Sequence, residues 1–245
     1  MSRAKIIRTM FLSIATLLIA GCGGDGIDGT GLIEIRGTAA IGAPIASATV
    51  TVKASDGTKK TSQTGQNGKF KANVSGLNGP FLMKIVQANG SALFSIADGG
   101  GTANIHPFTD WIVRNWFKVH GLDIESEFNS STAAAQLPSV AQINEIEAAI
   151  KKIIALVLVE YNLPADLNLI SSVFEANNQG FDYFLDHADV VIIDNRITVI
   201  VNDPKSSLDG EIVKDVGLET NLAQSDVTPP SVPAGLRVIP ANGTE

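Results

Sequence analysis

The stretch GTAAIGAPIASATVTV, residues 37–52, followed by TSQTGQNGKFKANV, residues 61–74, decides the fold of the N-terminal half. Apolar and polar residues alternate in both stretches, as they do in strands with one buried face. Asp-Gly and Asn-Gly pairs punctuate the runs and are typical of tight turns between antiparallel strands. We therefore predict an antiparallel sheet or small sandwich over 32–97. The alternation directs Val50 and Val52 inward and directs outward Thr49, Thr51 and Lys53.

The same two stretches resemble the carboxypeptidase regulatory-like domain, a transthyretin-like sandwich. That family runs from a glycine-containing first strand through a Pro-Ile and Ala-x-Val turn into a Thr-x-x-x-Gly-x-Phe hairpin. The residues that match are Gly37, Pro44, Ile45, Ala48, Val50, Thr64, Gly68 and Phe70. The resemblance implies a seven-stranded sandwich that serves as a spacer or binding module and contains no catalytic group. An unrelated immunoglobulin-like sandwich fits the same alternation.

After the glycine-rich turn at 98–102 the apolar spacing becomes helical. Pro107 suits the first position of a helix, His106 is placed to cap it, and Gly121 suits its C-terminal end. Ser139 and Gln142 form a capping box for a second helix that we expect to run to Pro164. Two shorter helices are expected at Leu169–Ala176 and Phe181–His187.

The first of these helices carries an apolar stripe that includes Trp111 and Trp116. Two tryptophans so close together could form a carbohydrate platform, but helical spacing among other apolar residues favours the core. We expect Trp111 to be the more buried and Trp116 to lie at the margin of the stripe. In the second helix we expect Glu147 and Lys151 to pair on the exposed side, and the apolar C-terminal half to be buried.

Two β-branched runs, Val190–Ile193 and Ile197–Val201, predict a hairpin. Beyond it, the sequence SDVTPPSVPAGLRVIPANGTE resembles the opening of a fibronectin type III domain. The chain stops before such a domain could form. We therefore expect either a fragment or truncated gene product, or a protein that ends in an unfolded remnant.

The stretch LLIAGCGG, residues 17–24, holds the only cysteine of the chain. Basic residues and an apolar run too short to span a bilayer precede it, which is the pattern of a signal peptide. Ile19 to Cys22 resembles a bacterial lipobox, in which the cysteine thiol is acylated before cleavage. An ordinary signal peptide with a stray cysteine is the alternative. The resemblance implies lipidation of Cys22, and Gly23 after it implies the outer membrane rather than the inner.

The charge balance bears on the partners of the chain. The sequence has 18 Lys and Arg against 25 Asp and Glu, and the proposed signal peptide contains three basic residues and no acidic one. The mature chain would therefore be more acidic than the formal net charge of −7. Such a chain is a poor partner for nucleic acid. We expect a membrane, through the lipid, and a protein or polysaccharide at the cell surface as partners.

Catalytic motifs are not evident in the sequence. It contains no G-x-S-x-G elbow, H-E-x-x-H pair or P-loop. One acidic cluster could hold a cation, although it lacks the spacing of an EF-hand and a solvated helix end explains the same residues. Its members are Asp182, Asp186, His187, Asp189 and Asp194. We predict no enzyme activity, no cofactor and no metal.

Together these patterns predict an α+β protein with an N-terminal antiparallel β-sandwich, a helical region and a C-terminal β-hairpin. The expected segments are a signal peptide at 1–21, a lipidated cysteine and tether at 22–31, the sandwich at 32–105, helices at 106–188, the hairpin at 189–222 and a linker at 223–245. The predicted function is that of a membrane-anchored surface lipoprotein acting as a structural, adhesion or interaction module. The alternative is the anchoring and spacer portion of a larger secreted enzyme.

Overall fold

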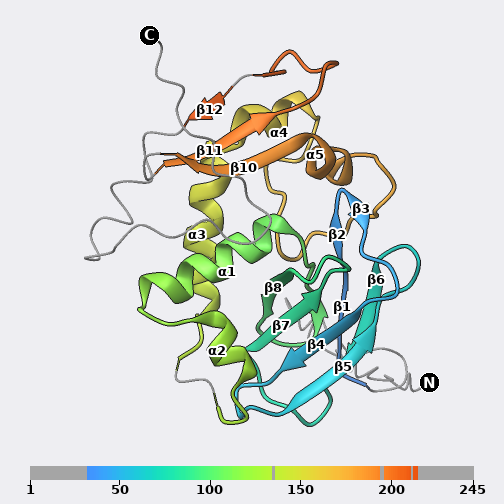
Figure 1. Ribbon diagram of the computed structural model, residues 1–245, viewed down its shortest axis with the longest axis vertical. Coiled ribbons are helices and arrows are strands. Elements are labelled where there is room, and N and C mark those ends of the chain that lie inside the picture. Colours follow the sequence, from blue (N-terminus) through green and yellow to red (C-terminus); the bar gives the residue numbers. More distant parts are fainter. Residues whose placement is uncertain (1–31, 134–135, 194–195, 211, 215–245) are drawn as a thin grey trace, which may run out of the picture.

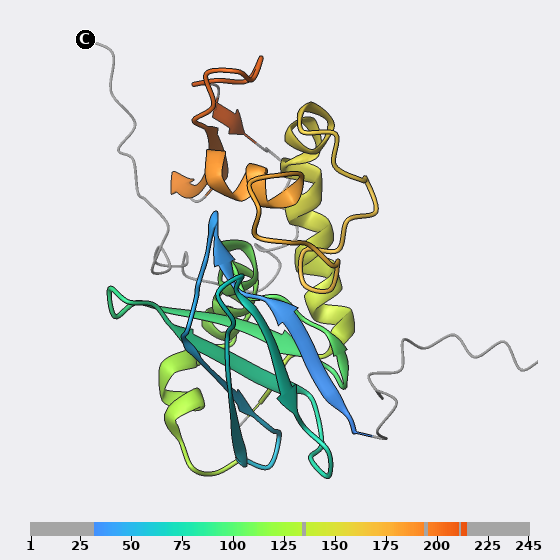
Figure 2. The same ribbon diagram turned by 90° about the vertical axis from the view of Figure 1, so that its right-hand side faces the viewer.

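Two β-sheets occupy the N-terminal half of the computed structural model (Figures 1 and 2). The structure describes residues 32–133, 136–193, 196–210 and 212–214. The predictions for the signal peptide, Cys22, the tether and the segment 223–245 lie outside the described residues. What is described combines strands and helices, so the α+β class is confirmed.

The larger sheet is antiparallel throughout, and its strands are ordered β5 (Lys59–Gln63), β4 (Thr49–Lys53), β7 (Phe81–Val86) and β8 (Ala92–Ala97). The smaller sheet is ordered β6 (Lys69–Asn73), β1 (Glu34–Thr38) and β9 (Gly101–Thr102). A short hairpin joins β2 (Ala40–Ile41) to β3 (Ala43–Pro44). The expectation of purely antiparallel pairing is wrong at one place, because β1 and β9 run parallel.

The strands of both sheets contribute to one core. Val50 and Val52 from β4 are fully buried, as are Ile35 and Ile85 on other strands. Lys53 corrects the expected alternation, because it is buried rather than outward. Its ammonium group donates to the carbonyl oxygen of Glu127, which lies in a helix packed against the sheet. A long apolar stem with a satisfied charge at its tip explains why the lysine occupies a buried position.

Helices cover one side and one end of the two sheets (Figure 1). They are α1 (Pro107–Val119), α2 (Ile124–Asn129), α3 (Val140–Ile153), α4 (Ala155–Glu160) and α5 (Phe181–His187). The predicted ends of α1 are confirmed: Pro107 is its first residue, the His106 side chain accepts from the Thr109 amide, and Gly121 after the helix has φ 68°. The capping box of Ser139 and Gln142 is also present at α3.

Both tryptophans of α1 lie in the core, with Trp111 1% and Trp116 2% exposed. Their burial is confirmed, but the expected difference between them is absent. Trp116 is covered from a second side because His120, one turn later, stacks on its ring with 4.0 Å between the centroids. The residue that ends the helix, His120, therefore covers the margin of the apolar stripe and shields Trp116 from water.

The second predicted helix differs from expectation in three respects. It breaks at Ile154, which ends α3 and begins α4. Leu156 and Val159 on α4 are 64% and 75% exposed, so the C-terminal half is not buried all round. Glu147 is buried instead of pairing on an exposed face, because its carboxylate accepts from the Leu169 amide across the interior. Lys151, its expected partner, is only partly buried.

The segment 169–176 forms turns, so the helix predicted there is wrong. The hairpin is confirmed: β10 (Ala188–Ile193) pairs with β11 (Arg196–Val201), and β12 (Ile212–Lys214) adds a third strand. This sheet is separate from the other two and lies beside α4 and α5 at one end of the molecule (Figures 1 and 2). Within the described residues, the helices are all too short or too polar to cross a bilayer.

Candidate functional site

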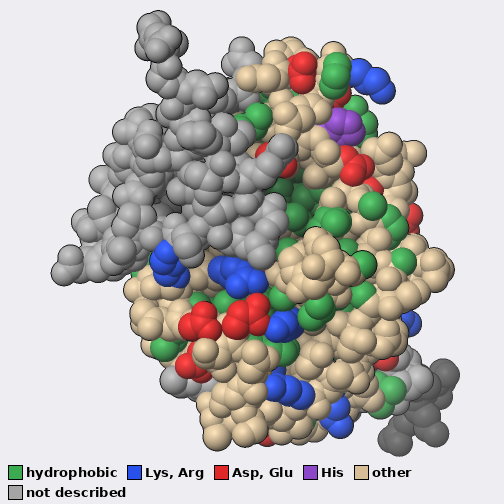
Figure 3. Space-filling model, viewed as in Figure 1, with side chains coloured by type: hydrophobic (Ala, Val, Ile, Leu, Met, Phe, Trp, Pro, Cys, Tyr) green, Lys and Arg blue, Asp and Glu red, His purple; other side chains and the backbone are tan. Residues whose placement is uncertain are grey.

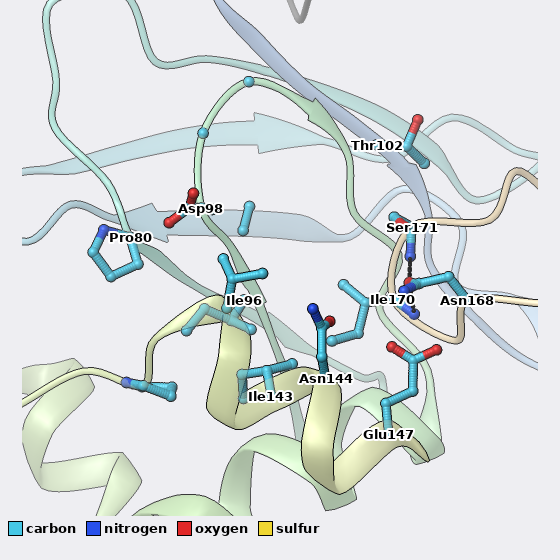
Figure 4. A pocket seen from close by; sticks show the side chains of 15 residues that line it. Pro80, Ile96, Asp98, Thr102, Ile143, Asn144, Glu147, Asn168, Ile170 and Ser171 are labelled. Carbon is cyan, nitrogen blue, oxygen red and sulfur yellow. Dashed lines mark hydrogen bonds between the residues drawn. The ribbon is translucent and has the colours of Figure 1, made fainter. Parts of the chain in front are cut away.

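A cavity of about 230 Å³ lies where three parts of the fold meet (Figure 4). One wall is α3, a second is the turn from β8 to β9, and the third is the segment that follows Leu167. Ile96, Ile143 and Ile170 supply apolar surface. Polar side chains complete the lining: Asp98, Thr102, Asn144, Glu147, Asn168 and Ser171. Apolar walls with a few polar groups are the usual composition of small-molecule sites.

Glu147 is the buried charged group of this cavity, with 3% of the residue exposed. It sits one helical turn after Ile143 and Asn144, and Figure 4 shows all three side chains rising from α3 toward Ile170. One carboxylate oxygen, Oε1, accepts from the Leu169 N–H at 2.7 Å. The other, Oε2, is buried and has no hydrogen-bond partner. The carboxyl group therefore has unused hydrogen-bonding capacity.

Burial raises the pKa of Glu147 above its ordinary value, because removal from water disfavours the charged form. The hydrogen bond from Leu169 and the charge of Lys151 act in the opposite direction and limit the rise. A hydrogen-bond donor or a positive charge placed in the cavity would stabilise the ionised form. The electrostatics of the site thus favour a donor or a cation over an acceptor or an anion.

Two buried side chains fix the backbone of Leu169, in the wall that carries Asn168 and Ser171. The Leu169 N–H donates to Glu147, and the Leu169 carbonyl oxygen lies 2.6 Å from Nε2 of His106. Because Nδ1 of His106 accepts from the Thr109 amide, the proton of the neutral ring is on Nε2 and is donated to Leu169. Complete burial lowers the pKa of His106 to about 4, so the ring is neutral near pH 7.

The turn at the rim is also fixed locally. Oδ1 of Asn168 accepts from the amides of Ile170, at 3.0 Å, and Ser171, at 2.6 Å. The Asn168 amide in turn donates to the Ser172 hydroxyl at 2.8 Å. Side-chain oxygens thus accept from backbone N–H groups that would bond to carbonyl oxygens in a helix. This explains why the segment forms turns. The cavity wall is preformed by the protein itself.

A larger hollow of about 550 Å³ lies over β1 and β6. Two of its three lining cations are engaged, since Arg36 pairs with Glu34 at 2.7 Å and Lys69 with Glu175 at 2.6 Å; the third is Lys71. It offers no buried polar group without a partner among the described residues. The smaller cavity at Glu147 is therefore the stronger candidate site.

The acidic cluster predicted from the sequence is spread over separate contacts. Oδ2 of Asp182 accepts from the Asn178 amide, and the residue is buried at the start of α5. Asp186 is exposed, and Asp189 accepts from the Asn202 side chain. Asp194 lies outside the described residues. In the described part of the chain no group of three or more His, Cys, Asp or Glu side chains could hold a metal ion.

His187, the remaining member of the cluster, belongs to a different arrangement. Its ring stacks on Tyr183 with 4.1 Å between the centroids, and its Nδ1 lies 2.8 Å from the Tyr183 carbonyl oxygen. The hydroxyls of Tyr183 and Tyr161 both donate to Oδ2 of buried Asp203, at 3.0 and 3.3 Å. Asp203 joins α4, α5 and the end of β11. Asp203 was not among the residues singled out from the sequence, and Glu147 was expected only as an exposed partner of Lys151, because the partners of both are 20 or more residues away.

No family model, curated protein or solved structure matches the chain. The resemblances to the carboxypeptidase regulatory-like and fibronectin type III domains therefore stay predictions.

Proposed function

We propose that the chain is a lipid-anchored, noncatalytic binding module of the bacterial cell envelope, held in the outer membrane through Cys22. The lipobox-like stretch supports the anchor, because acylation gives the single cysteine a chemical role. Acyl chains attached to it would hold the chain at the membrane. The glycine-rich residues 23–31 would then tether the β-rich domain to the lipid.

One observation supports the noncatalytic part of the proposal: three of the buried titratable groups bind backbone atoms of neighbouring elements. Asp110 accepts the Phe94 amide of β8, and Glu147 and His106 bind the two sides of Leu169. Groups committed in this way orient the helices on the sheets. A rigid scaffold with a preformed cavity fits binding better than acid–base chemistry.

The family proposed for the sandwich is supported by where its matching residues lie. Strands β5, β4, β7 and β8 in one sheet and β6, β1 and β9 in the other make the seven that the resemblance implies. A Cβ at Gly37 would lie 1.9 Å from the Ala103 carbonyl oxygen, so the parallel β1–β9 contact requires glycine. Thr64 and Ala48 are paired, with the Thr64 hydroxyl accepting from the Ala48 amide at 2.9 Å. Phe70 is buried in the core.

Surface charge supports the proposed choice of partners. On the face in Figure 3, basic side chains lie next to acidic ones over α1, α2 and the nearby strands. Lys84 and Arg114 both contact Glu125, at 2.6 and 3.5 Å. Cations paired in this way are not free to follow a phosphate backbone. A protein or polysaccharide of the cell surface, rather than nucleic acid, is the proposed macromolecular partner.

Fractionation of Gram-negative cells that express the whole chain tests the anchor. The unaltered chain should sediment with outer membranes, and the Cys22→Ser variant should not. Ser13→Ala is the matched control, because it alters the same apolar region and keeps the cysteine. Equal membrane association of Cys22→Ser and the unaltered chain would contradict the proposal. A catalytic domain encoded after residue 245 would instead favour the alternative, the anchoring part of a larger secreted enzyme.

A further inference from the structure

The cavity beside Glu147 has a consistent sign of charge. Its two charged lining residues are Asp98, at the exposed rim, and Glu147, in the buried wall, and both are acidic. Lys151 is one turn beyond Glu147 on α3 but does not line the cavity. A ligand that enters therefore meets negative charge at the mouth and at the wall. This pattern favours a cation and disfavours an anion.

The buried oxygen Oε2 of Glu147 identifies the group that the ligand must offer. Oε1 already accepts from Leu169, whereas Oε2 has no partner in the protein. Buried polar atoms in folded proteins are nearly always hydrogen-bonded, so an unpaired one in a cavity wall marks a place for a donor. An ammonium group supplies both the donor and the positive charge, and charge-assisted bonds of this kind are the strong ones.

The remaining walls limit the rest of the ligand. Ile96, Ile143 and Ile170 provide apolar surface close to the carboxylate, and Asn144 stands beside it on α3 (Figure 4). The volume of about 230 Å³ is smaller than that of pockets that hold drug-sized molecules. A bare metal ion would leave the isoleucines without contact, and the described residues contain no group of three or more His, Cys, Asp or Glu side chains that could hold one.

We propose that this cavity binds a small primary amine, whose ammonium group bonds the Glu147 carboxylate after a side-chain rotation that turns Oε2 toward the cavity, and whose short alkyl part packs between Ile143 and Ile170. This inference rests on the binding role proposed above but not on the lipid anchor. It adds the chemical class of a ligand to the macromolecular partners already proposed. No bond is made or broken in the ligand, because the cavity acts by recognition alone.

The experiment compares isobutylamine with isobutanol, which has nearly the same shape and no charge, on the purified mature chain at pH 7. Amide chemical shifts are followed by NMR. Isobutylamine should shift the amides of Ile170 and Ser171 saturably at millimolar concentrations, and isobutanol should bind at least ten-fold more weakly. Equal affinities for the two compounds, or no saturable shift with the amine, would overturn the inference. Because this comparison uses the unaltered chain, it does not depend on the folding of a variant.

A second arm tests the carboxylate itself. Glu147→Gln keeps an oxygen for the Leu169 amide and removes the charge, so it should weaken isobutylamine binding at least ten-fold. Glu145→Gln, an exposed change on the same helix, should leave binding unaltered. Asp98→Asn at the rim should weaken binding several-fold. Unchanged affinity in a folded Glu147→Gln chain would contradict the assignment of Glu147, whereas loss of membrane association in Cys22→Ser has no bearing on it.

Discussion

The Asp110 carboxylate accepts the Phe94 N–H at 2.8 Å, which bonds the first turn of α1 to the outer edge of the larger sheet. Strand β8 is the last strand of that sheet, so its outward backbone groups would otherwise be unpaired. The Thr109 hydroxyl lies 3.1 Å from the Phe94 carbonyl oxygen, and Arg114 donates to the Ala92 carbonyl oxygen at 3.0 Å. Side chains of one helix thus replace the missing neighbouring strand.

Replacing Asp110 by alanine should destabilise the protein by about 3 kcal/mol, because it leaves the buried Phe94 amide without its acceptor and removes the nearer of the two carboxylates that Arg114 contacts. Asp110→Asn, which retains an acceptor for Phe94, should cost less. Urea denaturation measures both, with the exposed change Glu145→Ala as the control that stays within about 0.5 kcal/mol. An alanine variant as stable as that control would show that α1 does not protect the sheet edge.

His106 should titrate near pH 4 in the folded chain, because burial lowers its pKa from 6.5 to about 4. The unfolded chain therefore binds more protons in that interval, and the contribution of His106 is full above pH 6.5 and falls as the pH is lowered toward 4. The loss is on the order of 3 kcal/mol. NMR titration of the ring protons measures the midpoint. A midpoint near 6.5 would mean that the ring is not buried as described.

Asp110 should affect the pH dependence of stability in the opposite direction to His106. Burial raises the pKa of Asp110 from 3.8 to about 7, against the lowering effects of Arg114 and Phe94. Its contribution is full below pH 3.8 and is lost as the pH rises through 7. We therefore expect the fall in stability between pH 6.5 and pH 4 to be steeper in Asp110→Asn than in the unaltered chain. Denaturation midpoints at several pH values measure the difference, and identical slopes would contradict it.

Trp111→Ala and Trp116→Ala should each cost about 3–5 kcal/mol, because both rings are buried and their removal leaves cavities. Val173→Ala is the control, since this side chain is 81% exposed. Thermal or urea unfolding measures the three variants. A tryptophan variant that keeps its stability but loses affinity for a polysaccharide would make α1 a binding face instead of a core helix.

Calcium and chelator should both leave the melting temperature unchanged. Asp182 and Asp189 accept from separate partners and Asp186 is exposed, and within the described residues they form no group that an ion would stabilise. Scanning calorimetry with and without the ion measures this. A rise of several degrees with calcium would restore the cation site that the sequence suggested.

Features set by neighbours in the chain could be predicted from the sequence. The capping residues of α1 and α3 act within a few positions, and the alternation of Val50 and Val52 depends only on strand geometry. Lys53 and Glu147 could not be placed, because each is buried by a partner on a distant segment, at Glu127 and Leu169. Strand alternation predicted an outward Lys53, and the i, i+4 spacing to Lys151 predicted an exposed Glu147.

The turns at 169–176 also depend on distant residues, which the spacing of nearby residues does not reveal. Their apolar residues recur with helical spacing, yet distant side chains take the backbone groups that a helix would need. Asn104 donates to the Ser172 carbonyl oxygen, and Glu147 and His106 bind Leu169. The wall of the candidate cavity is made from these contacts. For that reason the sequence drew attention to the acidic cluster, where no metal was predicted, and not to Glu147.

Mass spectrometry of the N-terminal peptide from membrane-purified protein tests the central claim most directly. The mature chain should begin at Cys22 and carry a diacylglyceryl group on its sulfur, with no peptide from residues 1–21. A mature chain that begins elsewhere, or that contains an unmodified Cys22, would contradict the proposal of a lipid-anchored module.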